Sequence, residues 1–301
     1  MNVRKAILPV AGMGTRFLPA TKAIPKELIP VIDKPVLQYV VEEAAAAGIT
    51  EIVLVTHTSK PAIERHFAVD ADLESDLRRR GKDELLALVE GICPAGVSFT
   101  FVLQDRVLGL GYAVSCAREV IGDEPFAVLL PDVLVDNREL GSDLATMIHR
   151  FQASGKSQVM VEEVDAQRVD QYGIVSLGAS DHSLSEVSRV LAPSMSADMK
   201  AIVEKPSVGE VRSNLAVVGR YVFPASLFDY LASTSPGADG EIQLTDAVAS
   251  LLQHSSVQAY RMEGVTYDCG SKVGCFQATL AFARRHPQFS AEFSALITQY
   301  Q

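Results

Sequence analysis

Short apolar runs alternate with helix-like segments along the first half of the chain. Residues 5–10 form an apolar run, residues 35–47 carry apolar side chains at helical spacing, and residues 51–56 (EIVLVT) are apolar again. A strand, a helix and a strand in this order predict a parallel βαβ unit. Further strands are predicted at 98–103, 126–130 and 157–163, and helices at 60–68, 72–90, 111–121 and 142–153. The first 165 residues therefore predict an α/β fold with a doubly wound, mostly parallel, Rossmann-like sheet.

The regular alternation of predicted strands and helices ends after residue 165. Strands are predicted at 172–177, 186–191, 201–204 and 215–223, and helices at 225–233, 243–253, 272–285 and 288–300. Neither an internal repeat nor a low-complexity linker separates the two halves. We therefore expect one domain over 1–301, in which 166–265 is a β/α insertion that completes a site shared with 1–165, and 266–301 forms C-terminal helices.

The charge of the chain limits its partners. It has 301 residues, of which 37 are acidic and 27 basic, so the formal net charge is −10. This balance argues against nonspecific binding to nucleic acid or to an anionic membrane. No apolar run reaches the 18 or more residues of a membrane span. A phosphorylated small molecule stays possible, because its site needs only a few local cations.

The cysteines and the first residues indicate a cytoplasmic protein. Cys93, Cys116, Cys269 and Cys275 form no C-x-x-C pair, which favours reduced thiols. The apolar run near the N-terminus is short and is followed by charge and proline, so it predicts a buried strand rather than a signal peptide.

The segment 11–27, AGMGTRFLPATKAIPKE, follows the first predicted strand and is typical of a phosphate-binding loop. Gly12 and Gly14 allow backbone N–H groups to approach phosphates, and Arg16, Lys22 and Lys26 add positive charge. Pro19, Pro25 and the following Pro30 prevent a helix across this stretch. A dinucleotide fingerprint would need glycine or alanine where Phe17 stands, and the Gly-Lys-Ser/Thr of a P-loop is absent.

Several motifs together resemble one enzyme family. Residues 11–49 resemble the signature of the bacterial UTP–glucose-1-phosphate uridylyltransferases, which belong to the sugar-nucleotide pyrophosphorylases. The other matching stretches are LGLGYA (108–113), LLPDVLVD (129–136), VEKP (203–206), VVGRYV (217–222), GEIQLTD (240–246) and YDCGSKVG (267–274). Their number and order cover nearly the whole chain. The resemblance implies that 1–165 bind the nucleotide and 166–265 bind the sugar phosphate.

The resemblance also implies roles on the nucleotide side. The backbone of Ala11 and Gly12 would hold the nucleoside, Arg16 would grip the triphosphate, and Lys26 would stabilise charge at the α-phosphate. Gln104 and Gly109 would face the edge of the uracil.

For the metal, the resemblance implies that Asp132 and Asp268 bind Mg²⁺. Asp132 follows the strand predicted at 126–130, and ligands of open α/β sheets bind beyond the carboxyl ends of strands. A Pro-Asp pair in this position is usually only a turn. With Arg16 and Lys26 expected opposite, we favour a metal ligand, because Mg²⁺ prefers carboxylate and phosphate oxygens.

On the sugar side, the resemblance implies that Glu204 binds the hydroxyls of glucose and Lys205 binds its phosphate. Gly173 would offer a backbone contact to the sugar. The alternative for Glu204 and Lys205 is an exposed, salt-bridged strand end. Glu241 could contact the sugar or begin the helix that follows it. One departure is Tyr112, where relatives usually carry histidine.

The activity expected from this resemblance joins UTP and glucose 1-phosphate to UDP-glucose and pyrophosphate with the help of Mg²⁺. The alternatives are a glucose-1-phosphate thymidylyltransferase and a regulatory relative without turnover. The regulatory relative would be signalled by loss of Arg16, Lys26 or Asp132, and all three are present. A homo-oligomer is expected by resemblance only.

Overall fold

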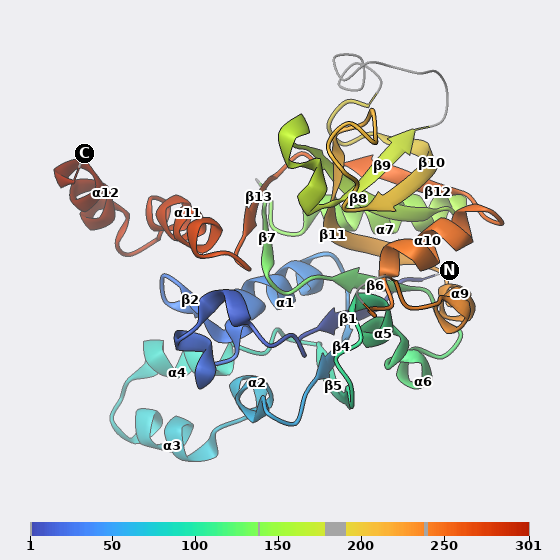
Figure 1. Ribbon diagram of the computed structural model, residues 1–301. Coiled ribbons are helices and arrows are strands. Elements are labelled where there is room, and N and C mark those ends of the chain that lie inside the picture. The colour runs from blue at the N-terminus through green and yellow to red at the C-terminus, as the bar shows by residue number, and fades with distance from the viewer. Residues whose placement is uncertain (1, 138, 178–190, 238–239, 301) are drawn as a thin grey trace.

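One nine-stranded sheet forms the frame of the molecule, in the strand order β5-β4-β1-β6-β11-β8-β12-β10-β9 (Figure 1). The computed structural model describes residues 2–137, 139–177, 191–237 and 240–300. The strands are β1 (Lys5–Pro9), β4 (Glu51–Thr56), β5 (Ser98–Leu103), β6 (Phe126–Leu129), β8 (Ser157–Glu163), β9 (Gly173–Leu177), β10 (Ser196–Glu204), β11 (Leu215–Phe223) and β12 (Val257–Arg261). Only β10 and β11 run against the common direction, so the expected mostly parallel sheet is confirmed.

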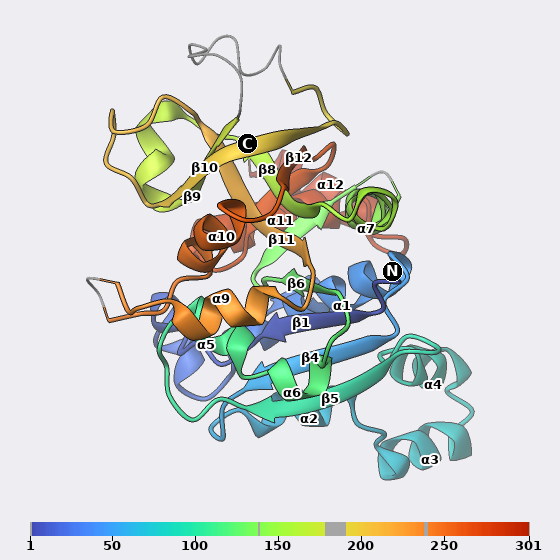
Figure 2. The same ribbon diagram turned by 90° about the vertical axis from the view of Figure 1, so that its right-hand side faces the viewer.

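Helices pack on both faces of the sheet, as a doubly wound fold requires. Along β1, Ala6 and Leu8 face a buried cluster that includes side chains of α1 (Val36–Ala46), α2 (Pro61–Phe67) and α7 (Ser142–Ser154). Ile7 faces a second cluster with α5 (Leu110–Ser115), α6 (Arg118–Ile121), α9 (Leu227–Ser233) and α10 (Leu244–Leu252). The alternation follows from the two-residue period of a strand. Figure 2 shows the two sets of helices on either side of the strands.

Two segments predicted as single helices are each divided. The segment 72–90 forms α3 (Ala71–Arg79) and α4 (Asp83–Glu90), with Gly81 between them at φ +65°. A left-handed residue cannot continue a right-handed helix, and the glycine adopts it without steric cost. The segment 111–121 forms α5 and α6, which are separated at Cys116 and Ala117.

In the second half, the strands differ from the prediction in length and number. β10 starts at Ser196 instead of residue 201, and β12 was not predicted at all. Both stretches are mixed in polarity, so they lack an apolar run, and they acquire strand structure by pairing with each other and with β8 or β9. The strand predicted at 186–191 lies outside the described residues, except for Leu191, which is in a bend.

A small two-stranded sheet links the C-terminal part to the core. β7 (Val133–Asp136) pairs antiparallel with β13 (Val265–Asp268), and Val133 is opposite Asp268. β2 (Pro30–Val31) and β3 (Lys34–Pro35) form a short hairpin. The helices α11 (Lys272–Ala283) and α12 (Ser290–Gln299) then lead away from the body of the molecule (Figure 1). Within the described residues, every helix is too short or too polar to cross a membrane.

Candidate active site

The predicted nucleotide-side residues converge because the strands that carry them are parallel. β5, β4, β1 and β6 are neighbours with the same direction, so their carboxyl ends share one edge of the sheet. Ala11 and Gly12 follow β1, Gln104 follows β5, and Asp132 follows β6. Lys26, in the loop after β1, and Asp132, 106 positions later, thus meet at the edge where ligands of open α/β sheets bind.

The loop after β1 contains three short 3₁₀ turns and no α-helix between Gly12 and Leu28, as its prolines predict. The turns are η1 (Thr15–Phe17), η2 (Ala20–Lys22) and η3 (Lys26–Leu28). Gly14 has φ +66°, and its carbonyl accepts a 2.7 Å hydrogen bond from the Thr21 hydroxyl. The side chain of Lys26 runs close to both glycines: a Cβ on Gly14 would lie 3.1 Å from Cβ of Lys26, and one on Gly12 would lie 3.6 Å from its Nζ. Glycine at these positions leaves room for Lys26.

Lys26 and Asp132 form an ion pair across this edge, with Nζ 2.6 Å from Oδ2. Burial acts to raise the pKa of Asp132, but the Lys26 ammonium and its hydrogen bond hold that pKa below its ordinary value. Burial likewise acts to lower the pKa of Lys26, and the Asp132 carboxylate keeps it raised. Both groups are therefore charged at neutral pH.

A second ion pair, which we did not predict, lies beneath the loop. The ammonium of Lys60 donates to both carboxylate oxygens of Glu27 at 3.0 and 2.9 Å and to the carbonyls of Val10 and Gly12 at 2.7 and 2.5 Å. Burial raises the pKa of Glu27 and lowers that of Lys60. Lys60 ties the end of β1 to the residue next to Lys26. In the sequence, Glu27 is noticeable only as a glutamate inside the phosphate-loop motif. No pattern links it to Lys60, which is 33 positions away.

Asp268 lies beside Asp132 because of the pairing of β13 with β7. A Cβ on Gly270 would lie 2.9 Å from an oxygen of each aspartate and 3.2 Å from Nη2 of Arg16. Arg16 also approaches Asp268, with Nη1 4.0 Å from Oδ2. Gly270, which has no side chain, thus leaves space around which Asp132, Asp268 and Arg16 gather. The first two are the predicted metal ligands, and Arg16 is a predicted phosphate ligand.

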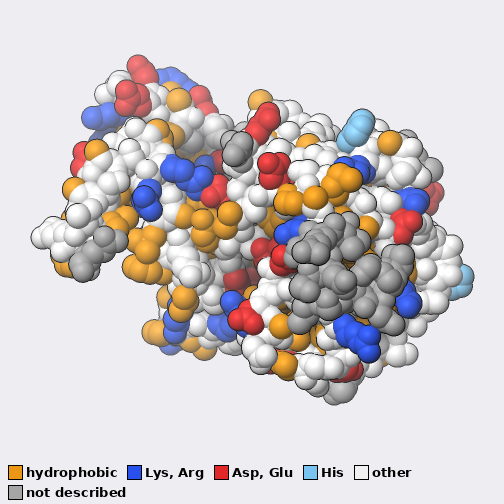
Figure 3. Space-filling model, turned by 90° about the horizontal axis from the view of Figure 1, so that it is seen from above, with side chains coloured by type: hydrophobic (Ala, Val, Ile, Leu, Met, Phe, Trp, Pro, Cys, Tyr) orange, Lys and Arg blue, Asp and Glu red, His pale blue; other side chains and the backbone are white. Residues whose placement is uncertain are grey.

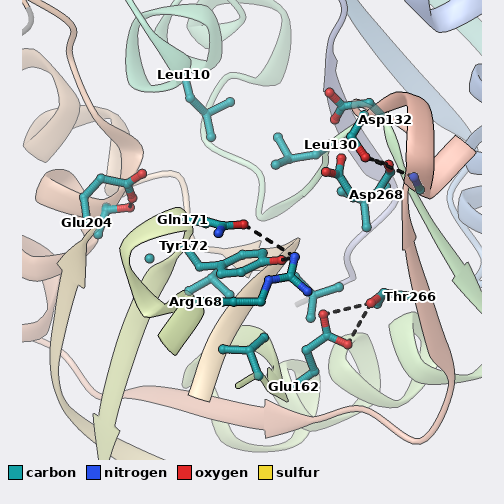
Figure 4. A pocket seen from close by; sticks show the side chains of 18 of the residues that line it. Leu110, Leu130, Asp132, Glu162, Arg168, Gln171, Tyr172, Glu204, Thr266 and Asp268 are labelled. Atoms are coloured by element: carbon teal, nitrogen blue, oxygen red, sulfur yellow. Dashed lines mark hydrogen bonds between the residues drawn. The ribbon is translucent and has the colours of Figure 1, made fainter. Parts of the chain in front are cut away.

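A cavity of about 670 Å³ extends from these aspartates to Gly173 and Glu204. Figure 4 shows Asp132 and Asp268 at one side of it and Glu204 at the other. Glu204 is opposite Gly173 in the pairing of β10 with β9, and its Oε2 accepts a 2.7 Å hydrogen bond from the Thr245 hydroxyl. On the face shown in Figure 3, acidic and basic side chains lie close together around the central hollow.

Not every predicted residue lines this cavity. Lys205 lies at its edge: its Nζ is 3.8 Å from Oε1 of Glu204, and its side chain is 59% exposed. Lys205 has φ +43°, a strained conformation for a residue with a side chain. Lys26, Gln104 and Gly109 do not line the cavity either.

Several polar residues of the cavity were missed, among them Arg168, Tyr172 and Glu162. The guanidinium of Arg168 donates to the hydroxyl of Tyr172 at 3.1 Å, and Glu162 accepts hydrogen bonds of 2.8 and 2.7 Å from Thr266. Burial raises the pKa of Glu162. Arg168 lies in the 3₁₀ helix η4 (Ala166–Gln171), where no motif of the sequence marked it. Arg168, Tyr172 and Glu162 line the cavity together with Asp268 (Figure 4).

Gln104 directly follows β5, and Gly109 directly precedes α5. Gln104 is 3% exposed, and its Nε2 donates to the carbonyl of Arg106 at 2.6 Å. Its Oε1 is buried and has no hydrogen-bond partner within the described residues. Gly109 has φ +93°, and a Cβ on it would lie 2.8 Å from Cβ of Glu241.

Glu241 precedes α10 by three positions, so it does not begin that helix. Its side chain lies against Gly109. Two backbone hydrogen bonds hold the segments together: Ile242 N donates to Leu108 O at 2.7 Å, and Gly111 N donates to Ile242 O at 2.8 Å. Tyr112, the departure from the usual histidine, donates its hydroxyl to Asp105, and this hydrogen bond raises the pKa of Tyr112 to about 12. Its contact is with the loop after β5, next to Gln104.

The fold and this arrangement of charges define a nucleotidyltransferase. Residues 5–284 match the family described as nucleotidyl transferase, and the chain belongs to that family, among its UTP–glucose-1-phosphate uridylyltransferases. The chain is 50% identical over 301 residues to the UTP–glucose-1-phosphate uridylyltransferase of Escherichia coli K12, covering 99% of this chain and 96% of that protein. The enzyme of the same name from Haemophilus influenzae is 48% identical, with 97% of each chain covered.

Solved structures agree with this classification. The UTP-bound UGPase from Acinetobacter baumannii superposes with a TM-score of 0.90 at 47% identity, covering 99% of this chain and 100% of that one. A UDP-glucose pyrophosphorylase complexed with UDP-glucose superposes with a TM-score of 0.81 at 35% identity, covering 94% and 100%. A putative glucose-1-phosphate thymidylyltransferase from Bacillus anthracis, at 23% identity and a TM-score of 0.69, shares the fold.

Proposed function

We propose that this protein transfers the uridylyl group of UTP to glucose 1-phosphate, producing UDP-glucose and pyrophosphate. The observation that carries the proposal is the Lys26–Asp132 pair, which lies between the glycine-rich loop and a cavity whose far side holds Glu204 and Gly173. A triphosphate and a sugar phosphate need adjoining sites of this kind. The whole of 1–301 would act as one nucleotidyltransferase domain.

The reaction is a displacement at phosphorus. A phosphate oxygen of glucose 1-phosphate attacks the α-phosphorus of UTP in line, a new P–O bond forms, and the bond to the bridging oxygen of pyrophosphate breaks. Two anions must approach each other, so catalysis depends on positioning and on neutralising charge. Lys26 and Arg16 supply positive charge on the triphosphate side, and Lys205 supplies it at the sugar phosphate. Asp132 keeps Lys26 charged and oriented until a phosphate oxygen replaces the Asp132 carboxylate as the partner of Lys26.

The two aspartates suit Mg²⁺ better than a softer metal. Both offer hard carboxylate oxygens beside Gly270, and no group of three His, Cys, Asp or Glu side chains that could hold a metal occurs in the described ranges. Mg²⁺ is typically held by one or two carboxylates together with substrate phosphates. When bound, Mg²⁺ would neutralise phosphate charge and favour the departure of pyrophosphate. Asp132 would be the main ligand, and the more exposed Asp268 the second.

On the sugar side, we assign Glu204 to the hydroxyls of glucose. Thr245 fixes one oxygen of its carboxylate, and the backbone of Gly173 lies next to it. On the base side, Ala11 and Gly12 would contact the nucleoside, and Gln104 and Gly109 would face the edge of uracil. Glu241 supports Gly109 and has no cavity-facing position, so its contribution would be indirect.

The test of this function is turnover with defined substrates. Release of pyrophosphate from UTP and glucose 1-phosphate, in the presence of Mg²⁺, is expected to far exceed release from dTTP. Binding without turnover would instead identify a regulatory relative. Equal or faster turnover with dTTP would reassign the enzyme as a thymidylyltransferase.

We also propose that the protein is a cytoplasmic homo-oligomer. Its four cysteines are free thiols, the state that a reducing compartment maintains. Large apolar side chains are exposed on the C-terminal helices and the turn between them: Val273, Phe276, Leu280, Phe289 and Leu296. Figure 3 shows orange side chains on the left, where Figure 1 places these helices. A second copy would cover them. Analytical ultracentrifugation of Phe276→Asp is expected to show a smaller particle than the parent, and an unchanged mass would contradict this interface.

A further inference from the structure

Arg220 is a charged side chain in the centre of the molecule, with 0% of its side chain exposed. It lies on β11, next to β6, and contacts the carboxylate of Glu43 on α1. Nε donates to Oε1 at 2.9 Å and Nη2 donates to Oε2 at 2.8 Å, so the contact is bidentate. The VVGRYV motif that contains Arg220 has no part in the substrate contacts proposed above.

The remaining N–H groups of Arg220 are directed at the chain around Asp132. Nη2 donates to the carbonyl of Val133 at 2.7 Å, and Nη1 donates to the carbonyls of Leu130 at 3.1 Å and Gly219 at 3.3 Å. A guanidinium has five N–H donors, and here all five have an acceptor. Leu130 and Val133 stand on either side of the Pro131–Asp132 pair. Arg220 therefore holds both ends of the four-residue segment that carries the Asp132 carboxylate.

The same segment is held a second time from β11. Leu130 N donates to Gly219 O at 2.9 Å. Gly219 has φ +87°, and a Cβ on it would lie 2.7 Å from Cδ1 of Leu130. The glycine lies within the register shift of β11 between Val217 and Tyr221. This irregularity allows Arg220 to reach the turn after β6 while β11 continues to pair with β8.

Stability alone is a poor reason for such a residue. Moving two charges out of water is costly, and buried ion pairs can often be replaced by apolar residues without loss. A benefit must then come from the geometry that the pair imposes. Groups that orient a metal ligand typically change metal affinity or activity by about 10–100-fold when they are mutated.

We propose that Arg220, anchored by Glu43, is a positioning residue that sets the place of the Asp132 carboxylate relative to Lys26 and Asp268. The inference builds on the function proposed above, in which Asp132 is a metal ligand. Arg220 contacts no substrate and acts only through the backbone of 130–133. Lysine could restore its charge but could not reproduce its five directed contacts.

The experiment compares Arg220→Lys and Glu43→Gln with the parent protein. A matched control is Tyr260→Phe, which removes an equally buried hydrogen bond, the 2.7 Å contact of the Tyr260 hydroxyl with Asp143, without touching 130–133. Three quantities are measured: the Mg²⁺ concentration for half-maximal turnover, the affinity for Mn²⁺ in the presence of UTP by calorimetry, and the carboxyl ¹³C titration of Asp132 in the metal-free protein.

We expect Arg220→Lys to raise the Mg²⁺ concentration for half-maximal turnover, and to weaken the affinity for Mn²⁺, by roughly 10-fold or more. The KM for glucose 1-phosphate should stay within about 2-fold of the parent value, and the Asp132 titration should shift. Glu43→Gln keeps the arginine but loosens its anchor, so a smaller change of the same kind is expected. The control should lose stability and keep the parent metal affinity.

If Arg220→Lys does not fold, Glu43→Gln decides between the two roles. A folded variant with the parent metal affinity and an unchanged Asp132 titration would overturn the proposal and leave Arg220 a structural residue. The titration of Asp132 is measured without substrate, so it also separates a failure of this inference from a failure of the proposed reaction.

Discussion

The Nζ atom of Lys26 lies 2.6 Å from Oδ2 of Asp132, although the two residues are 106 positions apart in the sequence. The contact joins the loop after β1 to the turn after β6, and these strands are parallel neighbours. Each charge offsets the cost of burying the other, which explains why the pKa of Asp132 is lowered and that of Lys26 is raised. In the proposed reaction, this pair is the point where triphosphate, metal and lysine meet.

Replacing Lys26 by alanine should lower kcat by about 10²-fold or more, the usual cost of losing one preorganised electrostatic donor. The fold should persist, because the loop has its own anchor in Lys60. Lys22→Ala is the matched control, since Lys22 lies in the same loop and is exposed. Steady-state kinetics of both variants decide the matter. Near-normal turnover of Lys26→Ala would remove this lysine from the mechanism.

Asp132→Asn and Asp268→Asn should both raise the Mg²⁺ concentration that turnover requires, with the larger effect at the more buried Asp132. If the two carboxylates serve one ion, the double variant should be little worse than the poorer single variant. A Mg²⁺ titration of all four proteins measures this. An unchanged Mg²⁺ dependence in Asp132→Asn would refute the metal assignment, and full additivity would give Asp268 a separate role.

Gln104→Glu should weaken UTP binding more than glucose 1-phosphate binding. The change replaces an amide by a carboxylate, so the contact with the Arg106 carbonyl loses its donor and two acceptors face each other. The KM values of the two substrates, together with a thermal unfolding curve, distinguish lost recognition from lost folding. A rise confined to the KM of glucose 1-phosphate would show that Gln104 faces the other ligand.

The ion pair predicts how stability depends on pH. The lowered pKa of Asp132 means that its contribution is complete above the ordinary aspartate value of about 3.9 and is lost as the pH falls through the lower folded value. In Lys26→Met, burial without a partner should raise the pKa of Asp132 instead. The difference in unfolding free energy between parent and variant should therefore grow as the pH rises from below the ordinary aspartate pKa towards neutrality, and then level off. Urea denaturation across this range measures it, and a constant difference would contradict the pairing.

Lys60→Met should be among the more destabilising single changes in the loop region. It leaves the carboxylate of Glu27, which is 0% exposed, without its cation, and breaking a buried pair in this way costs about 3–5 kcal/mol. The double variant Glu27→Gln with Lys60→Met should recover part of the loss, because no buried charge remains. Denaturant unfolding of the three proteins tests this. A loss below about 1 kcal/mol in Lys60→Met would mean that the pair is not held as described.

Local pattern was sufficient for several strands of the sheet. The ranges of β4, β5, β8 and β11 were predicted to the residue. Among them, β4 and β11 are central strands, whose two faces are covered, so their sequences read as nearly continuous apolar runs. The motifs around Gly12, Lys26 and Asp132 also followed from the sequence, since their residue types and their positions after strands are local features. β12 and the first part of β10 could not be predicted, because their strand structure depends on neighbours far away in the chain.

The sequence by itself thus determined the parallel core, the phosphate loop and the family to which the chain belongs. The tertiary structure decided how the candidate site is assembled: the pairing of β13 with β7 that brings Asp268 to Asp132, the Lys60 contact with Glu27, the contacts of Arg220 with 130–133, and the entry of Arg168 into the cavity. The physical reason is that hydrophobic periodicity records only which face of an element is buried. Contacts between polar side chains depend on the register of strands that are far apart in the sequence. They also depend on burial, because a polar group that is removed from water must find a hydrogen-bond partner. The spacing of residues within one segment shows neither of these.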